Sequence, residues 1–474
     1  MANMFAATQL PFITDYIALL ARTVKTHSGH ELSHAQQRWL GFCLVGILLT
    51  NAVNWKAFER AGLGKYKLAA LSWVFRRSKI PWDYLFQASV SLILSQHGIT
   101  HGVLVGDDSN RKRAKRTKKI HKAHKVFENK TSGYFNGQVV VFLLLVTQKV
   151  TIPVGFRFYV PDPKQVAWEK EDERLKKQGV EKLLRPAALS ADPKYPSKAD
   201  LLLEMIKDFR KHHPQITVKA ILADAFFGTK TFMNESSMLC ENVQVISQLR
   251  SNQIVLFRNR EWSLTDYFNA YPGVPQRIGI RGGKVIEALV SSARLYVRAH
   301  GEKRFVIAIK YPNEEEYRFL VAKDMGWRTV DIIQTYTLRW LVEVFFEDWK
   351  LYEGWANMAK QPGEEGSSRS LILSLLLDHA LILHPEQTAR LEQNLSACTV
   401  GSLRRFCQGE ALLEFVRDLL SAENVAERLA QLAEQVKTWF PLAPSGKHMS
   451  GRDLGRQEPT PALKYRAEYA CAGR

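Results

Sequence analysis

The chain has 474 residues, of which 66 are Lys or Arg and 47 are Asp or Glu, and its formal net charge is +19. This length exceeds one ordinary hydrophobic core, so we expect two to four structural units. The positive charge indicates a polyanionic partner, either nucleic acid or an anionic membrane surface.

The sequence contains neither the pattern of a membrane span nor that of a disulfide framework. Its longest apolar run, Trp39–Val53, is shorter than a bilayer span and predicts a buried helix. The five cysteines are scattered, odd in number and without C-x-x-C spacing, so we expect no zinc site and no disulfides. The start of the chain has no basic-then-apolar pattern, which favours a protein of the reducing cytoplasm that does not enter a membrane.

Residues 1–98 have a helical pattern throughout. Within them, Trp55–Lys79 predicts a short helix, a break at Gly62–Gly64, and a second helix that exposes Lys65, Lys67, Arg76 and Arg77. A helix-turn-helix that lies in a DNA groove has this pattern. Two short helices joined by Gly are also common in α-rich domains, so both interpretations stay open.

A short β-rich run, Gly102–Asn110 (GVLVGDDSN), follows the helices. It has the pattern of a buried strand that carries Asp107 and Asp108 at or near its end. A carboxylate in this place is either a turn former or a metal ligand. Because side chains alternate along a strand, only one of the two acids can face a given site.

The run Arg111–Lys125 comes next and has nine Lys or Arg residues in fifteen. By itself such a run is a solvated basic segment, but beside an acid pair it could hold a phosphate backbone against a metal site. The residues expected to contact DNA here are Arg111, Lys112, Arg113, Lys115, Arg116, Lys118 and Lys119.

Further apolar runs predict a mixed α/β sheet. Gln138–Thr147 and Val150–Val160 have the composition and spacing of a buried hairpin. Thr217–Asp224 (TVKAILAD) again ends in an acid, and Gln244–Leu249 completes a strand–helix–strand unit. Two separate strands that each end in Asp favour a shared site over two unrelated turns.

Short alternating runs separated by Gly and Pro predict a β-rich insertion at residues 251–323. Two of these runs are Lys284–Val290 and Ala293–Arg298. After Lys350 the pattern is helical to about residue 440. Residues 443–474 are rich in Gly, Pro and charge and are predicted to be mobile.

The stretch Asp331–Lys350 contains no Gly or Pro and is predicted to form one helix of about five turns. On a helical wheel one face carries Tyr336, Arg339, Glu343, Glu347 and Lys350, and an apolar stripe lies opposite. That polar face is either a solvated surface with an ordinary Arg339–Glu343 ion pair or a surface that presents charge to a ligand.

The acids Asp107, Asp224 and Glu343 can converge around divalent cations in such an arrangement. Oxygen ligands of this kind suit Mg²⁺, for which Mn²⁺ can substitute. Two such ions can activate a water or a 3′-hydroxyl at a phosphodiester and stabilise the leaving oxygen. Arg339 and Lys350 would then neutralise neighbouring phosphates. No Gly-rich P-loop pattern is present, so no nucleotide cofactor is expected.

The spacing Tyr336-x-x-Arg339-x-x-x-Glu343-x-x-x-x-x-x-Lys350 resembles the Tyr-Arg-Glu-Lys motif of bacterial cut-and-paste transposases of insertion sequence family four. The segments VGDDS and ILADAFFG lie where that family has its first and second catalytic aspartates. The resemblance covers about residues 100–360 and implies an α/β fold with a ribonuclease-H-like mixed sheet.

The resemblance also implies roles for these residues. Asp107, Asp224 and Glu343 would be the catalytic, metal-binding triad, and the DNA contacts would be Tyr336, Arg339 and Lys350. The reaction would nick the element end, form a hairpin by attack of the freed 3′-hydroxyl, reopen it with water and insert the element into target DNA. Its partners would be double-stranded DNA, as transposon ends and target, and a second subunit in a homodimer at the bacterial nucleoid.

The same resemblance divides the chain. A helical domain that binds DNA ends is expected at residues 1–98, and the catalytic core at 99–250 and 324–360 is interrupted by the β-rich insertion 251–323. A helical dimerisation region is expected at 361–442, before the tail 443–474.

Two other functions fit part of these patterns. A non-catalytic protein that only occupies repeat ends would share the basic charge and the helix-turn-helix. A metal-dependent endonuclease would share the triad but would not join strands. Because three carboxylates aimed at phosphates repel DNA unless a metal is present, the triad favours an enzyme over a binding protein.

Overall fold

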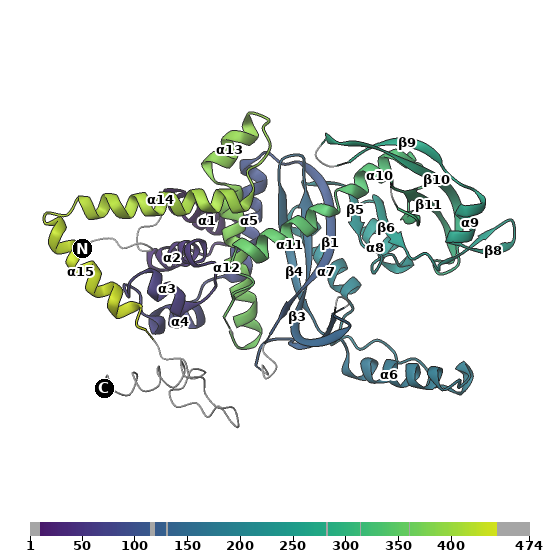
Figure 1. Ribbon diagram of the computed structural model, residues 1–474, viewed down its shortest axis with the longest axis horizontal. Coiled ribbons are helices and arrows are strands. Elements are labelled where there is room, and N and C mark those ends of the chain that lie inside the picture. The colour runs from purple at the N-terminus through teal and green to yellow at the C-terminus, as the bar shows by residue number, and fades with distance from the viewer. Residues whose placement is uncertain are drawn as a thin grey trace, which may run out of the picture. The chain divides into compact units, whose positions relative to one another are not determined.

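The computed structural model describes residues 10–113, 119–128, 131–280, 283–312, 314–359 and 361–442 (Figure 1). The predicted tail at 443–474 lies outside these residues. Internal contacts divide the chain into two units, Met1–Asp418 and Leu419–Arg474. Helix α15 (Val425–Trp439) belongs to the second unit, and the other elements lie wholly or largely in the first.

A mixed sheet of twelve strands runs through the described part of the first unit. Its hydrogen-bonded order is β2-β3-β1-β5-β6-β12-β11-β10-β7-β8, with β4 paired to β3 and β9 paired to β10. The pairs β1–β5 and β5–β6 are parallel, and the remaining pairs are antiparallel. The strands are β1 (His101–Lys112), β2 (His124–Glu128), β3 (Gly133–Val146), β4 (Thr151–Tyr159), β5 (Thr217–Ala223), β6 (Gln244–Leu249), β7 (Ile254–Phe257), β8 (Arg260–Ser263), β9 (Val274–Gly279), β10 (Val285–Val297), β11 (Glu302–Lys310) and β12 (Arg318–Ala322).

The predicted hairpin is confirmed as β3 and β4, which pair antiparallel. Every residue from Val139 to Val146 on β3 is buried, which requires cover on both faces of the sheet. This continuous apolar run therefore marks the centre of the fold.

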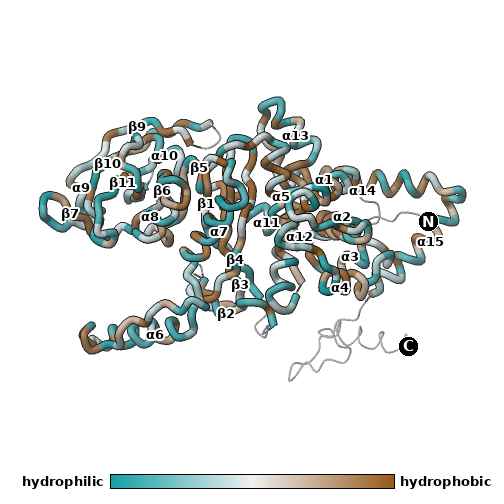
Figure 2. The backbone as a smooth tube through the Cα atoms, turned by 180° about the vertical axis from the view of Figure 1, so that it is seen from behind, coloured by the Kyte–Doolittle hydropathy of each residue, from teal (hydrophilic) through white to brown (hydrophobic). Residues whose placement is uncertain are grey.

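Helices α7 (Lys198–His212) and α11 (Trp340–Tyr352) cover opposite faces of the sheet. On one face Phe142 of β3 packs against Phe345, Phe346 and Trp349 of α11, with ring centroids 4.9–5.6 Å apart. On the other face a side chain added at Gly106 of β1 would lie 2.2 Å from Leu202 of α7. In Figure 1 α11 crosses in front of the strands, and in Figure 2, seen from behind, α7 lies over them.

The helices outside the sheet are shown in Figure 1. Those of the first unit are α1 (Pro11–Ser28), α2 (His34–Thr50), α3 (Trp55–Ala61), α4 (Leu68–Arg77), α5 (Trp82–Gln96), α6 (Pro163–Lys177), the 3₁₀ turn η1 (Lys182–Leu184), α8 (Lys230–Leu239), α9 (Leu264–Ala270), α10 (Thr329–Thr337), α12 (Gly363–Ile382), α13 (Pro385–Glu392) and α14 (Val400–Leu420).

Helix α12 lies inside the N-terminal helical bundle. It packs against α1, α2 and α5. Every residue from Ser370 to the end of the helix at Ile382 is buried. We expected residues 361–442 to form a helical region of their own. Instead α12 is apolar on all sides because helices from the start of the chain surround it.

The β-rich segment at 251–323 extends the core sheet, since β12 pairs with β6. Two of its expected runs form one strand, β10, because Ser291 and Ser292 keep their pairing with Ala308 and Ile307 of β11. The polar serine pair interrupts the alternating pattern in the sequence but does not interrupt the strand. The short elements β8 and α9 were not predicted.

No single helix in the described ranges is long and apolar enough to span a membrane. Two bent helix pairs, α2 with α3 and α12 with α13, meet the length and composition criteria only when taken together. The apolar run predicted as a buried helix forms most of α2, which begins with a capping box between Ser33 and Gln36 and is buried from Trp39 to Leu48.

Two buried carboxyl groups lie where α11 ends against α12. Glu353 caps α11 and is fully buried, and neither of its carboxyl oxygens receives a hydrogen bond from a described donor. Asp378 of α12 is its neighbour. Burial raises the pKa of both, that of Asp378 to about 7, and a proton held between them would supply the missing donor.

This pair predicts a pH dependence of stability. Between about pH 4 and pH 7 the native chain keeps a proton that the unfolded chain releases, so the free energy of unfolding falls as pH rises. Asp378→Asn removes one acid and gives Glu353 a permanent N–H donor, so it should flatten that slope. Urea unfolding across the pH range checks this, with Glu347→Gln on the exposed side of α11 as the control. An unchanged slope would show that the pair holds no shared proton.

Candidate active site

Two aspartates lie where the parallel pairing of β1 and β5 ends. The last paired residues are Gly106 and Ala223, and Asp107 and Asp224 come next on their segments. Because parallel strands end at the same edge of the sheet, the two carboxyl groups come near enough to interact electrostatically. The prediction that Asp224 ends a strand is confirmed, whereas β1 continues past Asp107 to Lys112.

Helix α11 brings Glu343 to the same face of the sheet. Asp107 pairs across the ladder with Phe142, so their side chains share the face on which α11 packs. Glu343 lies in the first turn of α11. The predicted single helix at 331–350 is wrong in one respect, because the chain breaks at Leu338–Arg339 between α10 and α11.

The guanidinium of Arg339 bridges two of the three acids. Its Nη1 lies 2.9 Å from Oδ2 of Asp107, and its Nη2 lies 3.5 Å from Oε1 of Glu343. Asp107 is nearly buried, whereas the Glu343 side chain is 43% exposed. Arg339 therefore lies at the centre of the acidic group, and its positive charge also favours the ionised form of Asp224.

The pKa values reflect a crowded, partly buried set of acids. Burial, followed by the charge of Asp224, raises the pKa of Asp107 to about 7, against the opposing charge of Arg339. Burial also raises the pKa of Asp224, although the backbone N–H of Phe226 donates to its Oδ1 at 3.0 Å. For both groups burial is the largest cause of the raised pKa, and the charge of Arg339 acts against it.

The donors at this site are carboxylate oxygens, which are the ligands that Mg²⁺ and Mn²⁺ prefer. Among the described residues, however, these acids do not form a group whose oxygens all lie within 4.8 Å of one another. The expected close convergence is thus incomplete, since three anions repel and Arg339 stands between two of them. The donor set fits a divalent cation that would draw the oxygens together.

The neighbouring acid, Asp108, points to the other face of the sheet. Its Oδ1 lies 2.8 Å from Nζ of Lys198, the first residue of α7. Strand alternation thus places Asp107 toward α11 and Asp108 toward α7. Lys198 was not predicted to lie at the site, because it is ninety positions away in the sequence and in a charged segment without a motif.

Tyr336 lies deeper in the protein than Arg339, and the two residues line one cavity. The Tyr336 side chain is buried, and its hydroxyl donates to the backbone carbonyl of Ala223 at 3.3 Å. The charges of Arg339, Asp224 and Asp107 all act on Tyr336, so the face predicted from the helical wheel is kept across the turn at Leu338–Arg339. The position of Tyr336 favours a role in holding α10 against the end of β5.

Lys350 lies about two turns of α11 beyond Glu343 and is half-buried. Burial lowers the pKa of Lys350, while the charges of Glu343, Asp107 and Asp108 act against that shift. Its ammonium group therefore lies within the field of the acidic group. Glu347, on the intervening turn, is exposed.

Arg111 and Arg113 bind the protein's own backbone. Arg111 donates to the carbonyls of Ala356 and Met358, at 3.0 and 2.7 Å, and Arg113 donates to Gln138 at 2.9 Å and to Met358 at 3.2 Å. Burial lowers the pKa of Arg111 to about 9 and that of Arg113 to about 10. Both were expected to contact DNA, but their described hydrogen bonds go to the loop after α11 and to Gln138 of β3.

The other residues of the basic run differ from these two. Lys112 extends outward and pairs with Glu128 of β2 at 2.8 Å, and Lys119 is exposed. Three more expected DNA contacts, Lys115, Arg116 and Lys118, lie outside the described residues. The exposed lysines remain available to a phosphate backbone.

The predicted pair of short helices is confirmed as α3 and α4, with a break at Gly62–Gly64. In helix α4 only Leu71 and Phe75 are buried. The basic residues predicted at exposed positions are exposed, and they are Lys65, Lys67, Arg76 and Arg77. The side chain of Trp73 is 61% exposed on the same helix.

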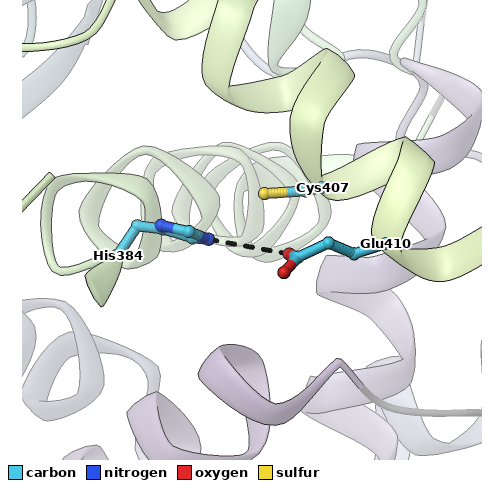
Figure 3. Close-up of side chains that lie close together, drawn as sticks. All are labelled: His384, Cys407 and Glu410. Carbon is cyan, nitrogen blue, oxygen red and sulfur yellow. Dashed lines mark ion pairs between the residues drawn. The ribbon is translucent and has the colours of Figure 1, made fainter. Parts of the chain in front are cut away.

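A second group of possible metal ligands lies between α13 and α14 (Figure 3), where His384 lies 3.9 Å from Glu410 and near Cys407. Nδ1 of His384 accepts the backbone N–H of Glu386 at 3.2 Å, so the neutral ring carries its proton on Nε2, facing Glu410. Burial raises the pKa of the Cys407 thiol to about 12. These protonation states suit a helix cap and disfavour metal binding.

Acids at neighbouring strand ends, beneath a helix that carries a third acid, form the arrangement of a phosphodiester-cleaving enzyme with a ribonuclease-H-like fold. Residues 30–267 match the profile of the DDE superfamily endonucleases, and the chain belongs to this family. The matched segment includes Asp107 and Asp224 and ends before Glu343.

A solved structure and the curated proteins complete the comparison. The chain is similar to a structure described as the cryo-EM structure of piggyBac transposase synaptic complex with hairpin DNA, with a TM-score of 0.42 and 10% sequence identity, over 94% of this chain and 87% of that chain. A comparison with curated proteins finds no match.

The contacts of Arg113 predict a structural role for this residue. Arg113→Ala should lower the free energy of unfolding by about 2 kcal/mol, because charged hydrogen bonds to Gln138 and Met358 are lost. The neighbouring Lys112→Ala removes only a surface pair and should cost less than about 1 kcal/mol. Urea unfolding checks both. If both variants lost the same small free energy of unfolding, Arg113 would have no structural role and would again be a candidate for DNA contact.

Proposed function

We propose that the protein is a DNA transposase that binds the inverted repeats of an insertion sequence, cuts at their ends and joins them to target DNA. The observation that carries this proposal is the grouping of Asp107, Asp224 and Glu343 around Arg339 on one face of a ribonuclease-H-like sheet. Membership of the DDE superfamily endonucleases supports strand cleavage, and the resemblance of the sequence supports insertion sequence family four.

In this proposal the three carboxylates hold divalent cations, Mg²⁺ with Mn²⁺ as a substitute. When bound, the ions supply activation of the attacking water or 3′-hydroxyl and stabilise the leaving oxygen. Asp107 and Glu343 approach from the strand and the helix, so they define two sides of the place where the scissile phosphate would lie. Lys350, on the same helix as Glu343, adds positive charge for a neighbouring phosphate.

The DNA-binding surface that we propose extends from this site to the N-terminal helices. Lys112 and Lys119 carry exposed charge near the site, and α4 carries Arg76 and Arg77 beside exposed Trp73. An exposed helix with basic ends after a short turn is the element that a helix-turn-helix places in the major groove. We propose that α4 reads the repeat, and that a homodimer pairs two ends in the bacterial cytoplasm.

We further propose that excision passes through a hairpin, as the resemblance implies. Such a step is helped when a nucleotide leaves the base stack and finds an aromatic surface. A cavity of about 330 Å³ beside Arg339 is lined by Tyr311, Tyr336 and Trp340 together with aliphatic, polar and charged side chains. A flat base would pack against these rings, so the cavity supports the hairpin route.

Labelled repeat-end DNA, Mg²⁺ and a target plasmid separate the candidate functions. A transposase yields cleaved ends and joined product, whereas an endonuclease yields cleaved ends alone. A protein that only occupies the repeats shifts the DNA without Mg²⁺ and leaves it intact. Gel analysis of the strands also reveals hairpin ends directly.

The proposed triad predicts a separation of binding from cleavage. Glu343→Gln should reduce strand cleavage at least about a thousandfold, because a metal-ligand site supplies several kcal/mol of charge stabilisation. Binding of repeat-end DNA, measured by fluorescence anisotropy, should change little. Glu347→Gln removes the exposed acid of the next turn and should cleave normally. Retained cleavage by Glu343→Gln would contradict the assignment of the third ligand.

A further inference from the structure

Both carboxyl oxygens of Asp107 are already engaged. Oδ1 accepts the backbone N–H of Asp108 at 2.7 Å, and Oδ2 contacts Arg339 at 2.9 Å. The first contact is made by a backbone group of the neighbouring residue on β1. The second is made by a side chain, and it is therefore the contact that can be exchanged.

Arg339 and a divalent cation compete for the same charge. A cation on Oδ2 of Asp107 would take the place of the guanidinium, and the two positive charges would repel each other if both stayed. Arg339 also reaches Glu343 at 3.5 Å, so its release would free two of the three proposed ligands at once. The half-buried position of Arg339 reduces screening by solvent and strengthens this competition.

A phosphate offers the guanidinium a replacement partner. Arg339 is the N-cap residue of α11, within the break between α10 and α11 and beside the proposed path of the DNA. A planar guanidinium binds phosphate oxygens as readily as carboxylate oxygens. A bound DNA backbone could thus take the side chain from Asp107 without leaving the guanidinium unpaired, and the freed carboxylate would be open to a cation.

We propose that Arg339 is an internal counter-ion of the acidic group, which holds Asp107 and Glu343 until DNA takes the guanidinium and the acids accept divalent cations. This inference rests on the proposed function. Arg339 is then a positioning residue that couples two binding events, and by linkage each event strengthens the other. The free protein would bind cations weakly and would cut little DNA outside a bound complex.

The coupling predicts an unusual gain of affinity. Without DNA, Arg339→Gln should bind Mn²⁺ about five- to 150-fold more tightly than the natural chain, the usual range for coupled sites. Electron paramagnetic resonance of free Mn²⁺ measures this, at an alkaline pH where Asp107 is ionised in both proteins. The rise of the melting temperature on addition of Mn²⁺ is the second readout, and it should be larger for the variant.

Two further variants test the cause. Lys350→Gln removes one positive charge from the same helix near the same acids. If its Mn²⁺ affinity rose as much as that of Arg339→Gln, the effect would come from net charge alone, and the proposal would be overturned. Arg339→Lys keeps the charge but loses the planar fork, and it should fall between the natural chain and Arg339→Gln. If Arg339→Gln does not fold, Arg339→Lys replaces it as the test variant. Mn²⁺ affinity that is unchanged in both Arg339 variants would overturn the counter-ion role.

Asp107→Asn separates this proposal from the proposed function. If Mn²⁺ binding is lost in Asp107→Asn but unaltered in Arg339→Gln, the triad stands and the coupling fails. If Asp107→Asn binds Mn²⁺ as tightly as the natural chain does, the ligand assignment itself fails, and the counter-ion proposal fails with it.

Discussion

The packing of α11 around Phe142 determines where the acidic group forms. Phe142 is fully buried, and three aromatic side chains of α11 surround it on the face that also carries Asp107. Burial of a Phe side chain in such a cluster contributes on the order of 3–5 kcal/mol, far more than the surface ion pairs of the same helix. The apolar contact therefore positions Arg339 and Glu343, and the charged contacts follow from it.

That position places like charges together, and the fold offsets the repulsion in two ways. At the strand ends, Arg339 contributes a positive charge that lies between acids. At the far end of α11, burial and the neighbouring acids raise the pKa values of Glu353 and Asp378, which favours their protonated forms. The two ends of one helix thus show both responses of proteins to crowded carboxylates, which are charge pairing and protonation.

The elements that could be predicted from the sequence have strong local patterns. The apolar runs ending in Asp107 and Asp224 identified β1 and β5, and parallel pairing then brought the acids together. Other features depend on contacts that no local pattern reveals. The break at Leu338–Arg339 has no Gly or Pro to mark it, and the partners of Arg111 and Arg113 come from a loop about 245 positions away.

The burial of α12 among α1, α2 and α5 has a consequence for biosynthesis. The N-terminal helices leave the ribosome long before residues 363–382. Their apolar inner faces therefore stay uncovered until α12 has been synthesised. Chains that stop short of this helix would expose those faces and be open to aggregation and proteolysis. The bundle is therefore complete only after most of the polypeptide has been translated. The packing of the end of α11 against α12 is delayed in the same way.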